Sequence, residues 1–203
     1  MRTPAKNPKA KKAILDAAQE LMLSKGFAAT SVDEICKKAK LTKGTFFHYF
    51  KSKEDLGKTA LERFCCSSRD TMQACGCGEK NSDPLKRVYG YVDFARGAAK
   101  KPAYLAGCLL GTFTQELSDT HPRLRAACAD GFDAWAGILK KDLKEAKAKY
   151  APKADFDCNE LAEYFISVFE GSLLLAKARK DNRIIEKNLT LFKGYLKTLF
   201  KKG

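Results

Sequence analysis

The stretch from Gly26 to Phe50 reads GFAATSVDEICKKAKLTKGTFFHYF, and it decides how the N-terminal quarter of the chain folds. Glycine at its start is a common helix stop, and Ser31 followed three residues later by Glu34 has the spacing of a capping box. Short apolar stripes then lie on either side of a break at residues 40–42. The stretch therefore predicts two short helices joined by a tight turn.

A further helix is predicted upstream of this stretch. Asn7-Pro8 supplies a cap and a first-turn proline, and Ile14, Ala18 and Met22 follow at helical spacing. Three short helices with a tight break before the third describe a helix-turn-helix, whose last helix enters the major groove of DNA.

The helix expected from Lys43 to Phe50 has two chemically different sides. Lys43, Gly44, Thr45 and His48 offer donors and small groups for a groove. Three aromatic residues of the same segment supply bulk for the reverse side: Phe46, Tyr49 and Phe50. Thr30 and Ser31 precede a helix N-terminus, where hydroxyl and backbone N–H groups bind phosphate well. We therefore expect this region to contact DNA.

Helical periodicity continues through the rest of the chain, with no β-type alternation, internal repeat or glycine-rich phosphate loop. The predicted class is all-α with about nine helices. A three-helix DNA-binding domain is expected over residues 1–54 and a larger helical domain over 55–203. The further helices are expected at 53–72, 85–100, 104–117 and 122–149, followed by two strongly apolar ones after a linker at 150–157.

The charge distribution supports this division. The chain carries 38 basic and 24 acidic side chains, a net charge of +14. Residues 1–53 contribute a net +8, residues 54–139 none, and residues 140–203 a net +6. A basic N-terminal module on a neutral body suggests that the first binds a polyanion and that the second has another task.

Several classes of protein are disfavoured. The longest apolar run, Ala103 to Phe113, is about half the length of a membrane span. The lysine-rich start lacks the apolar core of a secretion signal, so a cytoplasmic location is expected. His48 and His121 are the only histidines, and no nucleophile–base arrangement or nucleotide loop accompanies them, so an enzyme is not expected.

Four blocks of sequence resemble the DNA-binding domain of the TetR family of bacterial regulators. They are Ile14-Leu15-Asp16-Ala17-Ala18, Gly26 to Val32, Lys43 to Phe50, and Ser52-Lys53-Glu54-Asp55-Leu56, in the family's order and spacing. The resemblance covers residues 10–56. It implies a homodimeric repressor with a small-molecule pocket in its C-terminal domain, whose last two helices pair with those of a second copy. Inducer binding then releases a palindromic operator.

Two positions depart from the family pattern. Lys40 stands where the turn usually has glycine, and a left-handed backbone there costs a side chain about 1 kcal/mol. Phe47 replaces a tyrosine that commonly donates its hydroxyl to a phosphate. The set of DNA-contact candidates is Thr30, Ser31, Thr42, Lys43, Gly44, Thr45, Phe47, His48 and Lys53.

The larger domain provides candidates for two further surfaces. Its two C-terminal helices are more apolar than one small core needs, so the dimer candidates are taken from them: Phe165, Phe169, Leu173, Phe192 and Leu196. Aromatic residues of the middle helices are candidates for the inducer pocket, although such residues are often plain core: Tyr91, Phe94, Phe113, Phe132 and Trp135.

The eight cysteines suggest no metal site or cofactor. Cys66 and Cys75 are nine residues apart, about 13 Å along a helix, whereas thiolates on one zinc lie about 4 Å apart. Cys75 and Cys77 stand in a predicted loop open to oxidation. Cys108 lies in a Gly-Cys-Leu segment that resembles a TetR subgroup, some members of which sense electrophiles or oxidants with that cysteine; a small buried thiol is the simpler interpretation.

The sequence thus predicts a sequence-specific, homodimeric DNA-binding repressor that binds a palindrome and responds to a small-molecule inducer or to thiol modification. A non-specific DNA-coating protein, or an activator or adaptor on the same scaffold, remains as an alternative. The neutral, aromatic-rich middle of the chain argues against DNA coating, which needs no pocket.

Overall fold

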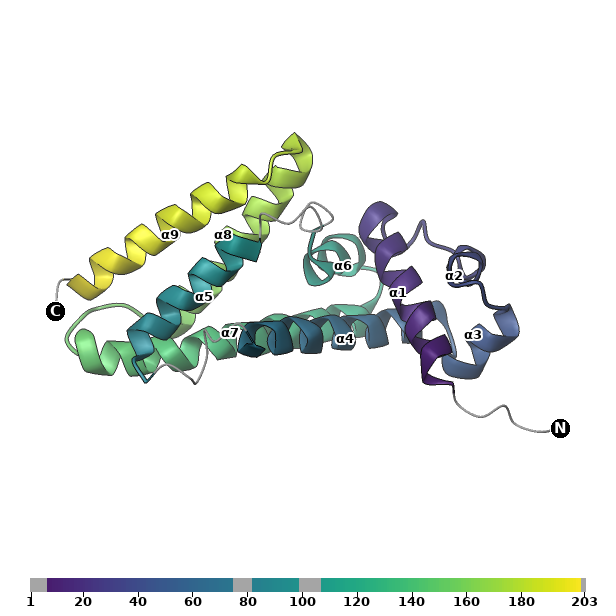
Figure 1. Ribbon diagram of the computed structural model, residues 1–203, viewed down its shortest axis with the longest axis horizontal. Coiled ribbons are helices and arrows are strands. Elements are labelled where there is room, and N and C mark those ends of the chain that lie inside the picture. The colour runs from purple at the N-terminus through teal and green to yellow at the C-terminus, as the bar shows by residue number, and fades with distance from the viewer. Residues whose placement is uncertain (1–6, 75–81, 99–106, 202–203) are drawn as a thin grey trace. The chain divides into compact units, whose positions relative to one another are not determined.

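In the computed structural model, residues 7–74, 82–98 and 107–201 are described, and within these ranges the regular structure is helical throughout (Figure 1). The predicted all-α class is confirmed. The helices of these ranges are α1 (Pro8–Lys25), α2 (Val32–Ala39), α3 (Lys43–Tyr49), α4 (Lys53–Ala74), α5 (Pro84–Ala98), α6 (Leu109–Leu117), α7 (Pro122–Tyr150), α8 (Cys158–Arg179) and α9 (Arg183–Lys201).

The predicted helix ends of the N-terminal region are present. The Asn7 side chain accepts from the backbone N–H of Lys9 and caps α1, which stops at Gly26. Ser31 and Glu34 form the complete capping box of α2, each side chain accepting from the other's backbone N–H. The predicted start of the sixth helix at Tyr104 lies outside the described residues.

The chain divides into two compact units. Unit 1 comprises residues 1–64 and 109–128, and unit 2 comprises residues 65–108 and 129–203. This division differs from the boundary at residues 54 and 55 expected from the sequence, because α6 and the first turns of α7 pack with the N-terminal helices.

Unit 1 has a core of fully buried side chains from the N-terminal helices. Ile14, Met22, Ile35, Phe46 and Phe50 are at most 2% exposed. Helices α1, α2 and α3 contact one another, and α6 lies against α1. We call α1–α3 the reading head.

Unit 2 is organised around the α8–α9 hairpin, whose helices run side by side with opposite directions (Figure 1). α5 packs on α9, where Lys193 pairs with Asp93 at 2.5 Å. The buried Arg87 of α5 pairs with Asp142 at 2.8 Å and with Glu145, both on α7. Because Arg87 is removed from water, these partners are needed to offset the cost of burying its charge.

Two lysines occupy the left-handed region that favours glycine. Lys40 ends α2 with φ 55°, and Lys180 ends α8 with φ 53°. The N–H of Leu41 donates to the carbonyl oxygen of Cys36 at 3.0 Å, which closes the α2 end as a Schellman motif. The turn therefore keeps the left-handed geometry that glycine adopts without strain.

Replacing Lys40→Gly should stabilise the protein by about 1 kcal/mol, because glycine removes the steric cost of φ 55°. Thermal unfolding monitored by circular dichroism measures the change. Lys180→Gly should act in the same direction, whereas Lys37→Gly, inside α2, should destabilise by a similar amount. A lower melting temperature for Lys40→Gly would contradict the argument.

Candidate DNA interface and ligand-binding unit

Helix α3 has one anchored side and one exposed side. Phe46 is fully buried, and Phe50 directly after the helix is 2% exposed. Lys43, Gly44 and His48 are exposed, as the sequence predicted for a groove-facing side. Phe47 is 56% exposed, with its ring edge-on to that of Phe46 at 5.1 Å.

Hydrogen bonds fix both ends of α3. The Thr42 hydroxyl caps the helix by accepting from the backbone N–H of Thr45 at 3.1 Å, and the two threonine hydroxyls lie 3.0 Å apart. At the other end, the Tyr49 hydroxyl accepts from the Asn7 N–H at 2.7 Å and donates to the Asn7 carbonyl at 3.0 Å. A helix of two turns thus has a fixed orientation on α1.

Nothing in the protein itself requires glycine at position 44. A Cβ added there would meet only the Thr42 hydroxyl within 4 Å, at an ordinary contact distance of 3.7 Å, and the residue does not have a positive φ. Glycine in a helix interior costs stability relative to alanine. Its presence is therefore better explained by something that approaches α3 from outside.

The charged candidates differ in how accessible they are. The Lys43 ammonium pairs with Asp33 at 2.7 Å, but both side chains are more than 60% exposed, so the pair contributes little and separates easily. That partner raises the pKa of Lys43, which stays charged. Ser31 is exposed and caps α2, but the Glu34 carboxylate already accepts from its backbone N–H and its hydroxyl.

Thr30 and Lys53 have intramolecular roles, although the sequence assigned both to phosphate contacts. Thr30 is fully buried and donates its hydroxyl to the Gly26 carbonyl at 2.7 Å. The Lys53 ammonium donates to the carbonyl oxygens of Phe27 at 2.9 Å and Thr30 at 3.0 Å, and lies 4.4 Å from the Phe27 ring centroid. Burial lowers the pKa of Lys53. These contacts turn both polar groups towards the protein.

Unit 2 brings together some of the aromatic candidates for the inducer pocket. The indole N–H of Trp135 donates to the Tyr91 hydroxyl, and the Phe132 ring stacks on Trp135 at 6.3 Å. Phe94 is half-buried on α5. Phe113 lies in unit 1 instead, where its ring is 5.5 Å from that of Phe27, so it belongs to the core under the reading head.

The five dimer candidates face the interior of their own chain. Phe165, Phe169, Leu173, Phe192 and Leu196 are each at most 7% exposed. Phe165 packs against Tyr91 and Trp135 with centroids 5.2 and 6.2 Å apart, so it also completes the aromatic cluster. The apolar side chains of α8 and α9 that remain exposed are Tyr164, Leu174, Leu175, Leu191 and Tyr195.

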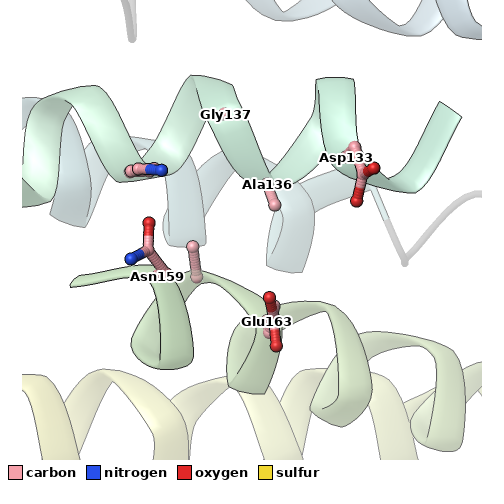
Figure 2. Close-up of a pocket in the computed structure, with 7 residues that line it drawn as sticks. Asp133, Ala136, Gly137, Asn159 and Glu163 are labelled. Carbon is pink, nitrogen blue, oxygen red and sulfur yellow. The ribbon is translucent and has the colours of Figure 1, made fainter. Parts of the chain in front are cut away.

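A polar cleft of about 180 Å³ lies between α7 and α8 (Figure 2). Asp133 and Glu163 face it from opposite helices, and Asn159 lies further along. The Asn159 Oδ1 atom is buried without a hydrogen-bond partner among the described residues. None of the predicted pocket residues lines this cleft, which is therefore separate from the aromatic cluster.

The cysteines differ in environment. Burial raises the pKa of Cys36, Cys128 and Cys158, so these thiols stay protonated and unreactive at neutral pH. Cys65 and Cys66 lie on α4, and Cys66 is exposed. The loop candidates Cys75 and Cys77 lie outside the described residues.

Cys108 is buried directly before α6, next to Gly107 with φ 96°. Its thiol favours the charged form of the Glu170 side chain on α8. Burial raises the pKa of Glu170 to about 7, and its Oε1 atom has no hydrogen-bond partner among the described residues. Sequence reasoning missed Glu170, because no local pattern marks a helical glutamate that turns inward.

Glu170→Gln should reveal the cost of charging this carboxyl. Folding raises the pKa of Glu170 from 4.5 to about 7, so the protonated carboxyl adds to the stability of the folded protein. This contribution is fully present below pH 4.5 and is lost as the pH rises through 7. The unfolding free energy of Glu170→Gln relative to wild type should therefore increase by about 3 kcal/mol between pH 4.5 and about pH 8, in urea titrations. The exposed Glu163→Gln is the control on the same helix, and equal differences at both pH values would contradict the shift.

Comparisons with known proteins agree with this architecture. The family described as "Bacterial regulatory proteins, tetR family" matches residues 14–58, and the one described as "Tetracyclin repressor-like, C-terminal domain" matches residues 84–192. The transcriptional regulator AcuR of Cereibacter sphaeroides is 31% identical over 172 residues, which are 83% of this chain and 76% of that protein.

Two further relatives span nearly the whole chain. The HTH-type transcriptional repressor DhaR of a Mycobacterium species is 25% identical over 88% of this chain and 87% of its own. A solved structure of the regulatory protein TetR from Rhodobacter sphaeroides has a TM-score of 0.79 and 28% identity, covering 91% of this chain and 97% of that one.

Among the described residues, every helix is too short or too polar to serve as a membrane span.

The matched N-terminal region coincides with the reading head and the start of α4, and the matched C-terminal region runs from α5 into α9. The chain belongs to the TetR family of bacterial regulatory proteins, a class of helix-turn-helix transcriptional regulators and not of enzymes.

Proposed function

We propose that this protein is a homodimeric cytoplasmic repressor that binds a palindromic operator through α3 and releases it when a small-molecule inducer binds or a thiol is modified. The exposed side of α3 carries this proposal. Lys43, Gly44, Phe47 and His48 are all exposed there, while Phe46 anchors the opposite side. Donors beside a close-approach glycine suit base edges and phosphates in a major groove.

The dimer surface is assigned to the outer side of the α8–α9 hairpin. Exposed positions on α8 recur every three or four residues, from Tyr164 through Ser167 and Gly171 to Leu174. On α9, Leu191 is 72% exposed, and Gly194 beside it has open space around it. Glycines between exposed apolar side chains let helices of a second copy approach closely, and burying these side chains favours association.

The inducer is assigned to unit 2, near the Tyr91–Trp135 pair, where aromatic surface and hydrogen-bonding groups occur together. Thiol modification is assigned to Cys108. This buried thiol directly precedes α6 and influences the Glu170 carboxyl of α8. An adduct on the sulfur would need room at this buried position, and α6 in turn contacts α1 of the reading head.

Selection of bound sequences from genomic DNA, with thiols kept reduced, tests the proposed function. A palindrome with half-sites about one helical turn apart or somewhat more is the expected result, because two reading heads are paired in a dimer. Affinity for it should fall steeply with salt as lysines displace counterions. Recovery of no motif, with uniform loss of binding in salt, would favour a DNA-coating protein instead.

Gly44→Ala should separate DNA contact from folding. The added methyl group fits the protein, so the melting temperature should hold or rise, but it occupies space between α3 and DNA. We expect operator affinity to fall by about tenfold, measured by fluorescence anisotropy. Gly137→Ala is the matched control, since it also adds a methyl group to an exposed helical glycine in open space. Unchanged operator affinity in Gly44→Ala would remove α3 from the interface.

A further inference from the structure

The loop that joins α1 to α2 is held from α6 by one carboxylate. Glu116 Oε2 accepts a hydrogen bond from the Phe27 N–H at 2.7 Å, and Oε1 accepts one from the Ala28 N–H at 2.7 Å. Both N–H groups follow the end of α1, and neither donates to a backbone carbonyl group. A bidentate, charged acceptor therefore satisfies two adjacent backbone donors at once.

The same loop is closed from its other side by Lys53 of α4. Its ammonium donates to carbonyl oxygens of the loop, and the Glu116 charge favours the charged form of Lys53. The Phe27 ring is buried between Phe113 at 5.5 Å and His121 at 5.3 Å. All these groups belong to unit 1, so the contacts are internal to one compact body.

Gly26 makes room for the carboxylate. A Cβ at this position would lie 2.7 Å from Glu116 Oε2, closer than real contacts allow. The residue also has φ 89°, which side chains rarely adopt. The helix-ending glycine thus serves both the turn and the approach of α6.

The positions and orientations of α2 and α3 in the reading head depend on this loop. Ser31, which caps α2, comes directly after it, and α3 follows α2 through the hydrogen-bonded turn at Lys40. α6 itself continues from unit 2 through Gly107 and Cys108. A displacement of α6 is therefore transmitted to the loop through two short hydrogen bonds.

We propose that Glu116 is a positioning residue for DNA binding: its carboxylate couples α6 to the reading head through the Phe27 and Ala28 amides. This inference rests on the proposed function. It adds a residue, distant from α3 in sequence, on which operator affinity depends. Glu116 touches no DNA and acts through the α1–α2 loop.

Glu116→Gln tests the proposal in the full-length protein. The amide keeps the shape of the side chain but has one acceptor oxygen, so one of the two backbone N–H groups faces an NH₂ group. Hydrogen–deuterium exchange of the peptide covering residues 26–31 should become faster. Affinity for the selected operator should fall by about tenfold, a common size for coupling between sites.

Asp119→Asn is the control for charge, because it removes one carboxylate from an exposed position three residues away. If the loss of a negative charge were the only effect, both variants should bind DNA more tightly than the wild-type protein. The proposal instead predicts weaker operator binding for Glu116→Gln only. Glu116→Asp, which keeps the charge and both oxygens, should recover part of the lost affinity.

The readouts distinguish the possible failures. Unchanged exchange in residues 26–31 would show that the carboxylate does not hold the loop, and faster exchange with wild-type operator affinity would show that the loop does not position the reading head. Either result overturns the proposal. Failure of the wild-type protein to select any operator would contradict the proposed function itself, and with it any role of Glu116 in DNA binding.

Discussion

The reading head depends on how the six residues between α1 and α2 satisfy their backbone polar groups. A chain that leaves one helix and enters another within six residues cannot supply enough partners of its own, and buried N–H and C=O groups without partners are costly. Here Glu116 receives two of the N–H groups and Lys53 donates to the carbonyl side. Two opposite charges from two different helices thus fix the start of α2, and with it the orientation of α3.

Local signals made the helices of the reading head predictable from sequence. The Asn7 cap, the Ser31–Glu34 box and the stop at Gly26 act over at most four residues, and all three are present. The exposed side of α3 followed equally from the positions of its polar and aromatic residues along the helix. By contrast, Glu116 lies 89 residues from Phe27, and no pattern in its own helix marks it as a partner for a distant loop. Lys53 was assigned to phosphate for the same reason, since its carbonyl acceptors are 23 and 26 residues away.

The C-terminal hairpin shows a second limit of periodicity. Apolar residues cover more than one side of α8 and α9, so the pattern indicates two buried surfaces without saying which one is internal. The pattern predicts Phe165 and Phe192 at a dimer surface, yet they lie in the core with ring centroids 5.4 Å apart. The exposed set around Leu191 is left for association. Ring size does not separate the two sets, because Tyr164 and Tyr195 on the same helices are 50% and 45% exposed.

Coupling between a ligand and DNA requires an element whose equilibrium both sites can bias. The chain passes between the two units at residues 64–65, 108–109 and 128–129, and the first and third of these passages lie inside the continuous helices α4 and α7. Only the second runs through non-helical backbone, where Gly107 has a positive φ and Cys108 is buried. α6 follows directly, and Glu116 lies in the last turn of this helix. The nine residues of α6 therefore link the Cys108 segment, along the chain, to the helix end that carries Glu116.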